Sequence, residues 1–318
     1  MNKVDLEVTD LNTEEHAKEE ILAEEMPKKK KNNVMSTVLV CVGIMCIGIA
    51  IYGLYGSYKE YKDGQDIYNQ AEDEFVHVND DWGEDEIGTT TEDPNIPDEF
   101  VSENPDSSTT NTPAPEAPKG PWYERVSVDL KGLQAINPEI VGWLYFENEK
   151  INYPILQGED NEKYLTTAYN GAQSNVGSIF VDAANSGDFS DTHTLIYGHT
   201  LHDNTMLSRL KYYMTKSWYY ENHKYFQIFC GDEILRYQIF SYQEVGVDSY
   251  IYWERFESAK ELSDRMLQTS KINPGLNIED DDKIITFSTC VSDKAYRLVV
   301  SAVLVERYNI TDNILTEE

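Results

Sequence analysis

A cysteine, an arginine and a histidine in this sequence stand where they could act together in catalysis. Cys290 ends the apolar segment KIITFSTC, and Arg297 opens the next apolar segment seven residues later. His199 follows a third apolar segment, in which Gly198 gives the backbone room to turn. A thiolate nucleophile needs a proton-transfer partner, usually histidine near neutral pH, and arginine can donate to a developing oxyanion without titrating. The three residues therefore predict acyl-transfer chemistry at a cysteine.

Each of these residue types has a more ordinary explanation when it is taken alone. A cysteine at the end of a strand is more often a small buried apolar side chain than a nucleophile. A single histidine is usually structural, and an arginine at the start of a strand is usually a surface charge. The catalytic hypothesis therefore depends on elements that bring the three residues together.

Eight short segments between residues 121 and 318 have the composition of β-strands. They are rich in β-branched and aromatic residues and are separated by Gly, Asn, Asp and Pro. In chain order they are VGWLYF, INYPILQ, GSIFVD, HTLIYGH, YFQIFC, ILRYQIFSYQEV, KIITFSTC and RLVVSAVLVERY. Because they do not alternate regularly with helices, they predict a mostly β fold, a closed or nearly closed antiparallel barrel. If the last two strands are neighbours, Cys290 and Arg297 meet at one rim.

Helices are predicted at three places around this barrel. Residues 125–136 have helical apolar spacing, and Asn137-Pro138 marks the end of that helix. Residues 204–218 and 256–269 are predicted as helical insertions between strands. The predicted fold is thus an eight-stranded barrel with an N-terminal helix and helical insertions.

A membrane-spanning segment precedes this domain. Residues 34–55 carry no charge, and at about 1.5 Å per residue they would form a helix of roughly 33 Å, enough to cross a hydrocarbon core of about 30 Å. Lys28–Lys31 lie immediately before it, so the positive-inside rule places residues 1–33 in the cytoplasm and the rest outside. The alternative is a cleaved signal peptide, but this apolar run is longer than a signal h-region. We expect a single-pass protein of the cell membrane with an extracellular catalytic domain.

Residues 56–120 are predicted to be an acidic extracellular linker before a catalytic domain at residues 121–318. The linker is rich in Glu, Asp, Thr, Ser and Pro, although residues 58–75 have some helical periodicity. The formal net charge of the whole chain is −31, which excludes the basic surface that nucleic-acid binding requires.

The remaining cysteines and histidines point to no metal or cofactor. Cys41 and Cys46 lie in the apolar segment, so a disulfide framework is not expected, and Cys230 is predicted to be inert in the core. His193 and His202 are predicted to be structural or exposed. The sequence contains no Cys-x-x-Cys or His-Glu-x-x-His metal motif.

Several longer strings resemble the class B sortases, in the order of that family. ITFSTC followed by Arg297 resembles the sortase pattern T-L-x-T-C…R, with Phe287 where leucine is common. LIYGHTLHDNTMLSRL resembles the histidine segment of the class, and INPEIVGWLYF, INYPILQGEDNEKYL and GSIFVD also fit it. The stretch from Tyr250 to Leu276 resembles the helical insertion that marks class B. The resemblance covers about residues 122–308.

The resemblance implies a cysteine transpeptidase that cleaves a C-terminal sorting signal of the Leu-Pro-x-Thr-Gly or Asn-Pro-x-Thr-x kind after Thr. It implies a thioester at Cys290, proton transfer by His199 and stabilisation of the substrate or oxyanion by Arg297. The implied partners are surface proteins that carry the signal and an acceptor amine, commonly of a peptidoglycan precursor. The implied sorting-signal contacts are Asn161, Leu165, Tyr250, Ile251 and Ser288.

Three alternatives remain open at this point. A cysteine peptidase would share the first half-reaction and release its substrate to water. A pilin-polymerising sortase would use another protein as the amine. A non-catalytic tethered interaction protein is disfavoured because all three catalytic positions are intact.

Overall fold

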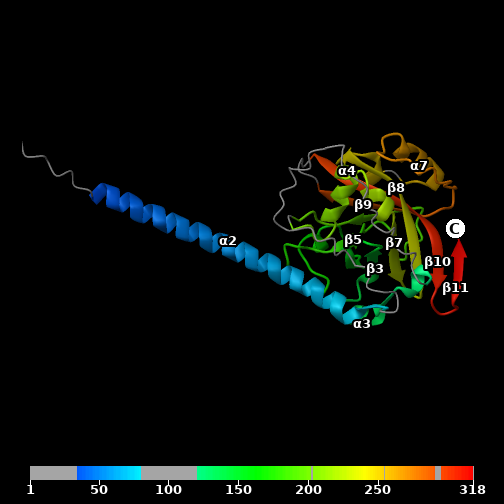
Figure 1. Ribbon diagram of the computed structural model, residues 1–318, viewed down its shortest axis with the longest axis horizontal. Helices are drawn as coiled ribbons and strands as arrows, with labels where there is room; N and C mark the ends of the chain where they lie inside the picture. Colours follow the sequence, from blue (N-terminus) through cyan, green and yellow to red (C-terminus); the bar gives the residue numbers. More distant parts are fainter. Residues whose placement is uncertain (1–33, 80–119, 202, 254, 291–294, 318) are drawn as a thin grey trace, which may run out of the picture. The chain divides into compact units, whose positions relative to one another are not determined.

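The structure is a computed structural model that describes residues 34–79, 120–201, 203–253, 255–290 and 295–317 (Figure 1). The chain divides into two compact units between Ser57 and Tyr58. Residues 1–33, predicted to be the cytoplasmic tail, lie outside the described residues.

The first unit contains the start of helix α2 (Val34–Phe75). By length and composition α2 is a candidate membrane span, with a mean hydropathy of 2.4 over its most apolar stretch. Its apolar side chains in this unit are exposed, among them Leu39, Ile44 and Met45. Such a surface is typical of a helix that faces lipid, so the helix is compatible with the predicted anchor at residues 34–55.

The second unit is built on the closed eight-stranded barrel that the sequence predicts. Its strands follow the order β10-β8-β7-β3-β4-β5-β6-β9, and pairing of β10 with β9 closes the ring. All eight predicted segments form strands: β3 (Ile140–Phe146), β4 (Asn152–Leu156), β5 (Ile179–Val181), β6 (His193–Tyr197), β7 (Tyr225–Cys230), β8 (Glu233–Gly246), β9 (Ile284–Cys290) and β10 (Tyr296–Asn309). A further strand, β11 (Ile314–Glu317), extends the sheet beside β10.

Two pairings in the barrel are parallel, which differs from the antiparallel barrel that we expected. β4 pairs with β5 in parallel, and β6 pairs with β9 in parallel. Parallel neighbours need a long crossover rather than a hairpin, and residues 157–178 supply it between β4 and β5. Strand composition does not distinguish the two directions, so the sequence pattern could not reveal this.

Stacked aromatic side chains fill the barrel. Phe226 stacks on Tyr237 at 5.2 Å between ring centroids and on Phe146 at 4.9 Å, and its ring contacts Phe287 edge-on. All four side chains are fully buried, as is Trp143. Such rings bury large apolar areas, so they contribute to the cohesion between the walls of the barrel.

The helical insertions lie close to where the sequence predicts them. The first contains the short helices η4 (Ser208–Lys211), α4 (Tyr212–Thr215) and α5 (Tyr219–Asn222). The second contains α6 (Tyr250–Trp253) and α7 (Ala259–Leu267). Ser258 caps α7 by accepting from Glu261 N at 3.1 Å, and α7 buries Ala259, Leu262 and Met266 in a second core cluster against the barrel.

The helix predicted over residues 125–136 is shorter in the structure. The segment forms a helical turn, η2 (Trp122–Glu124), then the strand β2 (Val126–Val128) and then α3 (Leu130–Ile136). Asp129 caps α3 by accepting from Gly132 N at 2.9 Å. This cap fixes the start of the helix several residues later than the apolar spacing suggested.

Residues 58–78 belong to the second unit, whereas the sequence predicted that the catalytic domain begins at residue 121. From Tyr58 onward α2 presents one buried stripe, in which Gly64, Tyr68, Ala71 and Phe75 recur at helical spacing. Strand β1 (Val76–Val78) then pairs with β2. The buried stripe was not predicted, because the charges on the exposed faces of the helix make the composition of the whole segment acidic. The rest of the predicted linker, residues 80–119, lies outside the described residues.

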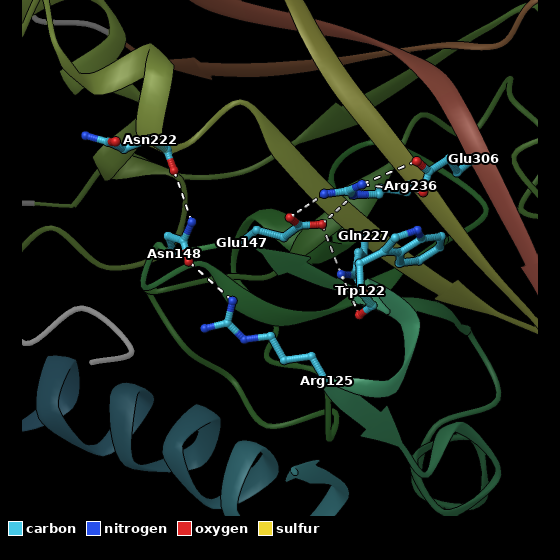
Figure 2. A network of polar contacts seen from close by, with 8 residues as sticks. All are labelled: Trp122, Arg125, Glu147, Asn148, Asn222, Gln227, Arg236 and Glu306. Atoms are coloured by element: carbon cyan, nitrogen blue, oxygen red, sulfur yellow. Dashed lines mark hydrogen bonds and ion pairs between the residues drawn. The ribbon is translucent and has the colours of Figure 1, made fainter. Parts of the chain in front are cut away.

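A charged network ties the segment before the barrel to three strands (Figure 2). Arg236 on β8 donates from Nε and Nη2 to the two carboxylate oxygens of Glu147, at 2.8 and 2.9 Å, and lies 3.4 Å from Glu306 on β10. Gln227 on β7 donates to Glu147 Oε1 at 3.1 Å and to the backbone oxygen of Trp122 at 3.4 Å. Bidentate pairing of this kind restricts geometry as well as adding energy, so the network helps to fix the register of these strands.

Candidate active site

Strands β6, β9 and β10 bring the three predicted catalytic positions to one rim of the barrel. Arg297 at the start of β10 is paired with Cys290 at the end of β9. In the parallel pair of β6 with β9, Tyr197 is opposite Ser288, and Gly198 N donates to Ser288 O at 3.3 Å. His199 and Cys290 each lie two residues beyond that Tyr197–Ser288 pair.

A cavity of about 360 Å³ opens beside this rim. Its walls include His199, Arg297 and the predicted substrate contacts Asn161, Leu165 and Ser288. Leu165 is exposed, whereas Ser288 is buried in β9. Five of the eight site residues that the sequence predicts therefore line one cavity, and a sixth, Cys290, directly follows its wall residue Thr289.

The imidazole of His199 contacts the loop that contains Leu165 and Gly177. Its Nε2 is 2.8 Å from the backbone oxygen of Leu165. Gly177 has a φ of +62°, and a Cβ there would lie 2.7 Å from Cδ2 of His199 and 2.7 Å from the Leu165 oxygen. Gly198 has a similar role before the turn, since a Cβ would lie 2.6 Å from Leu207 Cδ1. These two glycines let the chain pass close to the imidazole and the loop after it.

Arg297 contributes its side chain to the cavity wall from the first residues of β10. Its Nη1 donates to the backbone oxygen of Tyr296 at 2.8 Å. A permanent cation therefore lies in the same cavity wall as His199, at the position paired with Cys290.

The cavity also has a carboxylate that the sequence reasoning did not select. Oδ2 of Asp182 accepts from Nδ2 of Asn161 at 2.9 Å and from the hydroxyl of Tyr197 at 2.8 Å. Asn161 also accepts from Ala183 N at 2.8 Å, so both ends of its amide are engaged. Burial and the charge of Asp182 raise the pKa of Tyr197, so this hydroxyl stays protonated. The only sequence signal was an acidic residue at the end of the GSIFVD strand.

Two predicted substrate contacts do not line the cavity. Ile251 is fully buried in the second core cluster, and Tyr250 packs between Phe256 and the guanidinium of Arg265. The next residues in the chain, Tyr252 and Trp253, line the cavity instead. The hydroxyl of Tyr252 lies 2.9 Å from Ser288 Oγ, and Trp253 is 75% exposed. Successive residues of a helix point about 100° apart, so a shift of one or two positions changes which side chains face the substrate.

Cys230, His193 and His202 are the further residues that the sequence predicts to be inert, structural or exposed. Cys230 is buried, and desolvation raises its pKa to about 12, which keeps the thiol neutral. His193 is partly buried, with Nε2 2.9 Å from Thr286 Oγ1, and burial lowers its pKa to about 4. His202 lies outside the described residues. Within the part of the chain that the structure describes, no cluster of three metal-ligating side chains occurs.

The fold defines the class of protein: an eight-stranded closed barrel with N-terminal and inserted helices is the sortase fold. A family model of the sortase domain matches residues 144–305, and the chain belongs to the sortase family of cysteine transpeptidases. The chain is 34% identical over 185 residues to sortase B of Listeria monocytogenes, which is 56% of this chain and 75% of that protein.

Solved structures of class B sortases have the same fold. A sortase B–substrate complex of Staphylococcus aureus is similar with a TM-score of 0.51 and 32% identity, covering 55% of this chain and 83% of that one. A class B sortase of Streptococcus pyogenes involved in pilus biogenesis is similar with a TM-score of 0.51 and 27% identity, covering 56% and 98%. These similarities place the chain among the class B sortases.

Proposed function

We propose that this sortase uses Cys290 as nucleophile, His199 as acid and base, and Arg297 as the oxyanion or substrate clamp. The observation that supports this most is the strand pairing: Arg297 is the cross-strand partner of Cys290, and β6 leads His199 to the same rim. Directly opposite residues of an antiparallel pair stand on the same face of the sheet, within reach of one another.

The reaction runs in two acyl transfers. The thiolate of Cys290 attacks the Thr carbonyl of the sorting signal, and the leaving amine takes a proton from His199 as the peptide bond breaks. An incoming amine then gives a proton to His199, attacks the thioester carbonyl and releases the thiolate. Arg297 stabilises the negative charge on the carbonyl oxygen in both steps, because a fixed cation in a partly dry site requires no reorganisation.

The substrate is a surface protein with a C-terminal sorting signal. Asn161, Leu165 and Ser288 line the cavity beside the histidine, which supports their role as signal contacts. The same role for Tyr250 and Ile251 is less well supported than for Tyr252 and Trp253, whose side chains face the cavity. The related Staphylococcus aureus structure is a sortase B–substrate complex, which supports substrate binding by this chain as well.

The acceptor is an amine of a cell-wall precursor, and α2 anchors the enzyme where that precursor and exported proteins meet. In this topology residues 1–33 are cytoplasmic, residues 34–55 span the membrane and the catalytic domain is extracellular. Protease added to wall-stripped cells should digest the catalytic domain and spare the N-terminal tail. Protection of the domain would overturn this topology.

Pilin polymerisation is the second candidate, favoured by the similarity to a class B sortase involved in pilus biogenesis. Release of the substrate by hydrolysis is the third. The three differ only in the nucleophile that resolves the thioester: a wall-type amine, a protein lysine or water.

The test is mass spectrometry of the products from a panel of sorting-signal peptides, with and without added amines. We expect a cross-bridge mimic to divert the product from free acid to amide and to raise turnover, because a bound amine has a high effective concentration. A free acid with every amine would favour the peptidase. Cleavage by Cys290→Ala would exclude Cys290 as the nucleophile, and so would overturn this assignment of the site.

A further inference from the structure

The imidazole of His199 rests on the loop formed by residues 164–178, here called the supporting loop. The loop supplies the Leu165 oxygen that lies 2.8 Å from His199 Nε2. It also supplies Gly177, which approaches Cδ2 of His199 so closely that a Cβ would lie 2.7 Å away. A displacement of this loop would therefore move the imidazole directly.

Tyr68 of α2 binds the supporting loop through its hydroxyl. Its hydroxyl donates to the backbone oxygen of Gly177 and lies 2.9 Å from Oγ of Ser178. Ser178 Oγ in turn donates to the Thr167 oxygen at 2.7 Å. Tyr68 is only 4% exposed, and its ring contacts Tyr153 edge-on at 5.6 Å, so the hydroxyl is fixed in place.

α2 also packs closely against the supporting loop at Gly64. A Cβ at Gly64 would lie 2.7 Å from Ser174 Oγ and 2.7 Å from Val176 Cγ2. At the same level, the amide of Gln65 lies 3.4 Å from Oγ1 of Thr205, in the turn that follows His199. The helix thus contacts both segments that adjoin the histidine.

We propose that residues 58–75 of α2, here called the docked segment, are a positioning element for His199, acting through Tyr68 and Gly64. The segment touches no reacting atom. It sets the distance between the supporting loop and the turn after His199, and so the place of the imidazole relative to Cys290. This inference rests on the proposed acid–base role of His199.

The first test compares two variants on the same buried stripe of the full-length protein in detergent. Tyr68→Phe removes only the hydroxyl that holds Gly177 and Ser178. The matched control is Phe75→Leu, because Phe75 is buried on the same stripe and packs against α3, where a Cβ at Gly132 would lie 2.9 Å from its ring. Both variants are expected to lower the melting temperature.

Only Tyr68→Phe is expected to lower kcat, by about tenfold or more with KM for the peptide little changed, because small misplacements of a catalytic group cost rate more than binding. Equal kcat for Tyr68→Phe and the parent protein would overturn the inference. So would equal losses of kcat in Tyr68→Phe and Phe75→Leu at matched loss of stability, since that would show a purely structural role.

The second test compares two glycines of the same helix. Gly64→Ala pushes the helix away from Ser174 and Val176, whereas nothing lies within 4 Å of a Cβ at Gly56. Alanine is normally the better helix residue, so Gly56→Ala should leave kcat unchanged and Gly64→Ala should lower it. Unchanged kcat in Gly64→Ala would contradict the proposed contact.

The His199→Ala variant distinguishes a wrong role for His199 from a wrong role for the docked segment. If His199→Ala retains full cleavage, the acid–base role of His199 is wrong. If His199→Ala is inactive while Tyr68→Phe and Gly64→Ala are normal, the proposed function stands and the positioning role of α2 is wrong.

Discussion

Arg297 on β10 is the direct cross-strand partner of Cys290 on β9. β9 and β10 are antiparallel neighbours that close the barrel, so two positions seven residues apart in the sequence lie opposite one another. Because both positions belong to the same pair, any shift of register between β9 and β10 would separate them. The pairing explains how an arginine at the start of one strand comes to lie opposite a cysteine at the end of another.

Replacing Arg297 by lysine should lower turnover by about 10²-fold or more, equivalent to about 2.7 kcal/mol of transition-state stabilisation. Lysine keeps the charge but loses the planar, forked donor geometry. The measurement is steady-state cleavage of a sorting-signal peptide. Arg307→Lys, at the other end of β10 and paired with Glu233 at 2.7 Å, is the matched control and should keep near-normal turnover. Near-normal rates in Arg297→Lys would remove this guanidinium from the mechanism.

Replacing Asp182 by alanine should raise KM by about tenfold with a smaller effect on kcat. The carboxylate holds Asn161 and Tyr197 in the cavity wall, and both would lose a partner. Peptide titration of cleavage rates measures the two constants. Asp188→Ala removes an exposed carboxylate that lines a different cavity and should change neither. A selective fall in kcat would assign Asp182 to chemistry rather than to substrate binding.

Glu149→Ala should destabilise the protein by about 3 kcal/mol or more, because it leaves a partly buried cation unpaired. Glu149 is only 3% exposed, forms an ion pair with Arg209 and accepts from the hydroxyl of Tyr219. Urea unfolding of the variant measures the loss. Glu221→Ala removes an exposed partner of Lys224 at 3.6 Å and should cost less than about 1 kcal/mol. Similar losses in the two variants would contradict the structure at Glu149.

A fragment of residues 58–318 should be markedly more stable than one of residues 120–318. The longer fragment keeps the buried side chains of Tyr68, Ala71 and Phe75, and large buried side chains are each worth about 2–5 kcal/mol. Thermal unfolding of both fragments tests this. Deletion of residues 80–119 alone, which lie within the predicted linker, serves as the control and should preserve the melting temperature. Equal stability of the two fragments would mean that the docked segment adds nothing to the domain.

The protein should lose stability as the pH falls from about 6.5 to about 4, in part through His193. Its folded pKa of about 4 lies below the unfolded value, so in this window the unfolded chain binds a proton that the folded chain does not. His193→Gln should therefore flatten the pH dependence of unfolding by about 1–2 kcal/mol between about pH 7 and about pH 5. His77→Gln, at an exposed position, is the control. Parallel pH curves for His193→Gln and the parent protein would contradict the lowered pKa.

The sequence by itself determined the strands and the positions of the candidate catalytic residues. Each of the eight barrel strands is a local run of β-branched and aromatic residues bounded by turn residues, so composition was sufficient to find them. Local sequence was also sufficient to place Cys290, His199 and Arg297 near the ends of strands.

Only the tertiary structure decided which strands pair and which side chains face the cavity. The parallel pairing of β6 with β9 joins segments more than eighty residues apart in the chain, and nothing local encodes it. Tyr252 and Trp253 face the cavity in place of Tyr250 and Ile251, because packing of the insertion sets the rotation of its short helix. The docked segment is where the structure differs most from the sequence prediction, because its charged outer faces dominate the composition. Its proposed role depends on contacts of Gly64 and Tyr68 with a loop more than a hundred residues away. Long-range packing, which sequence periodicity does not record, decides such contacts.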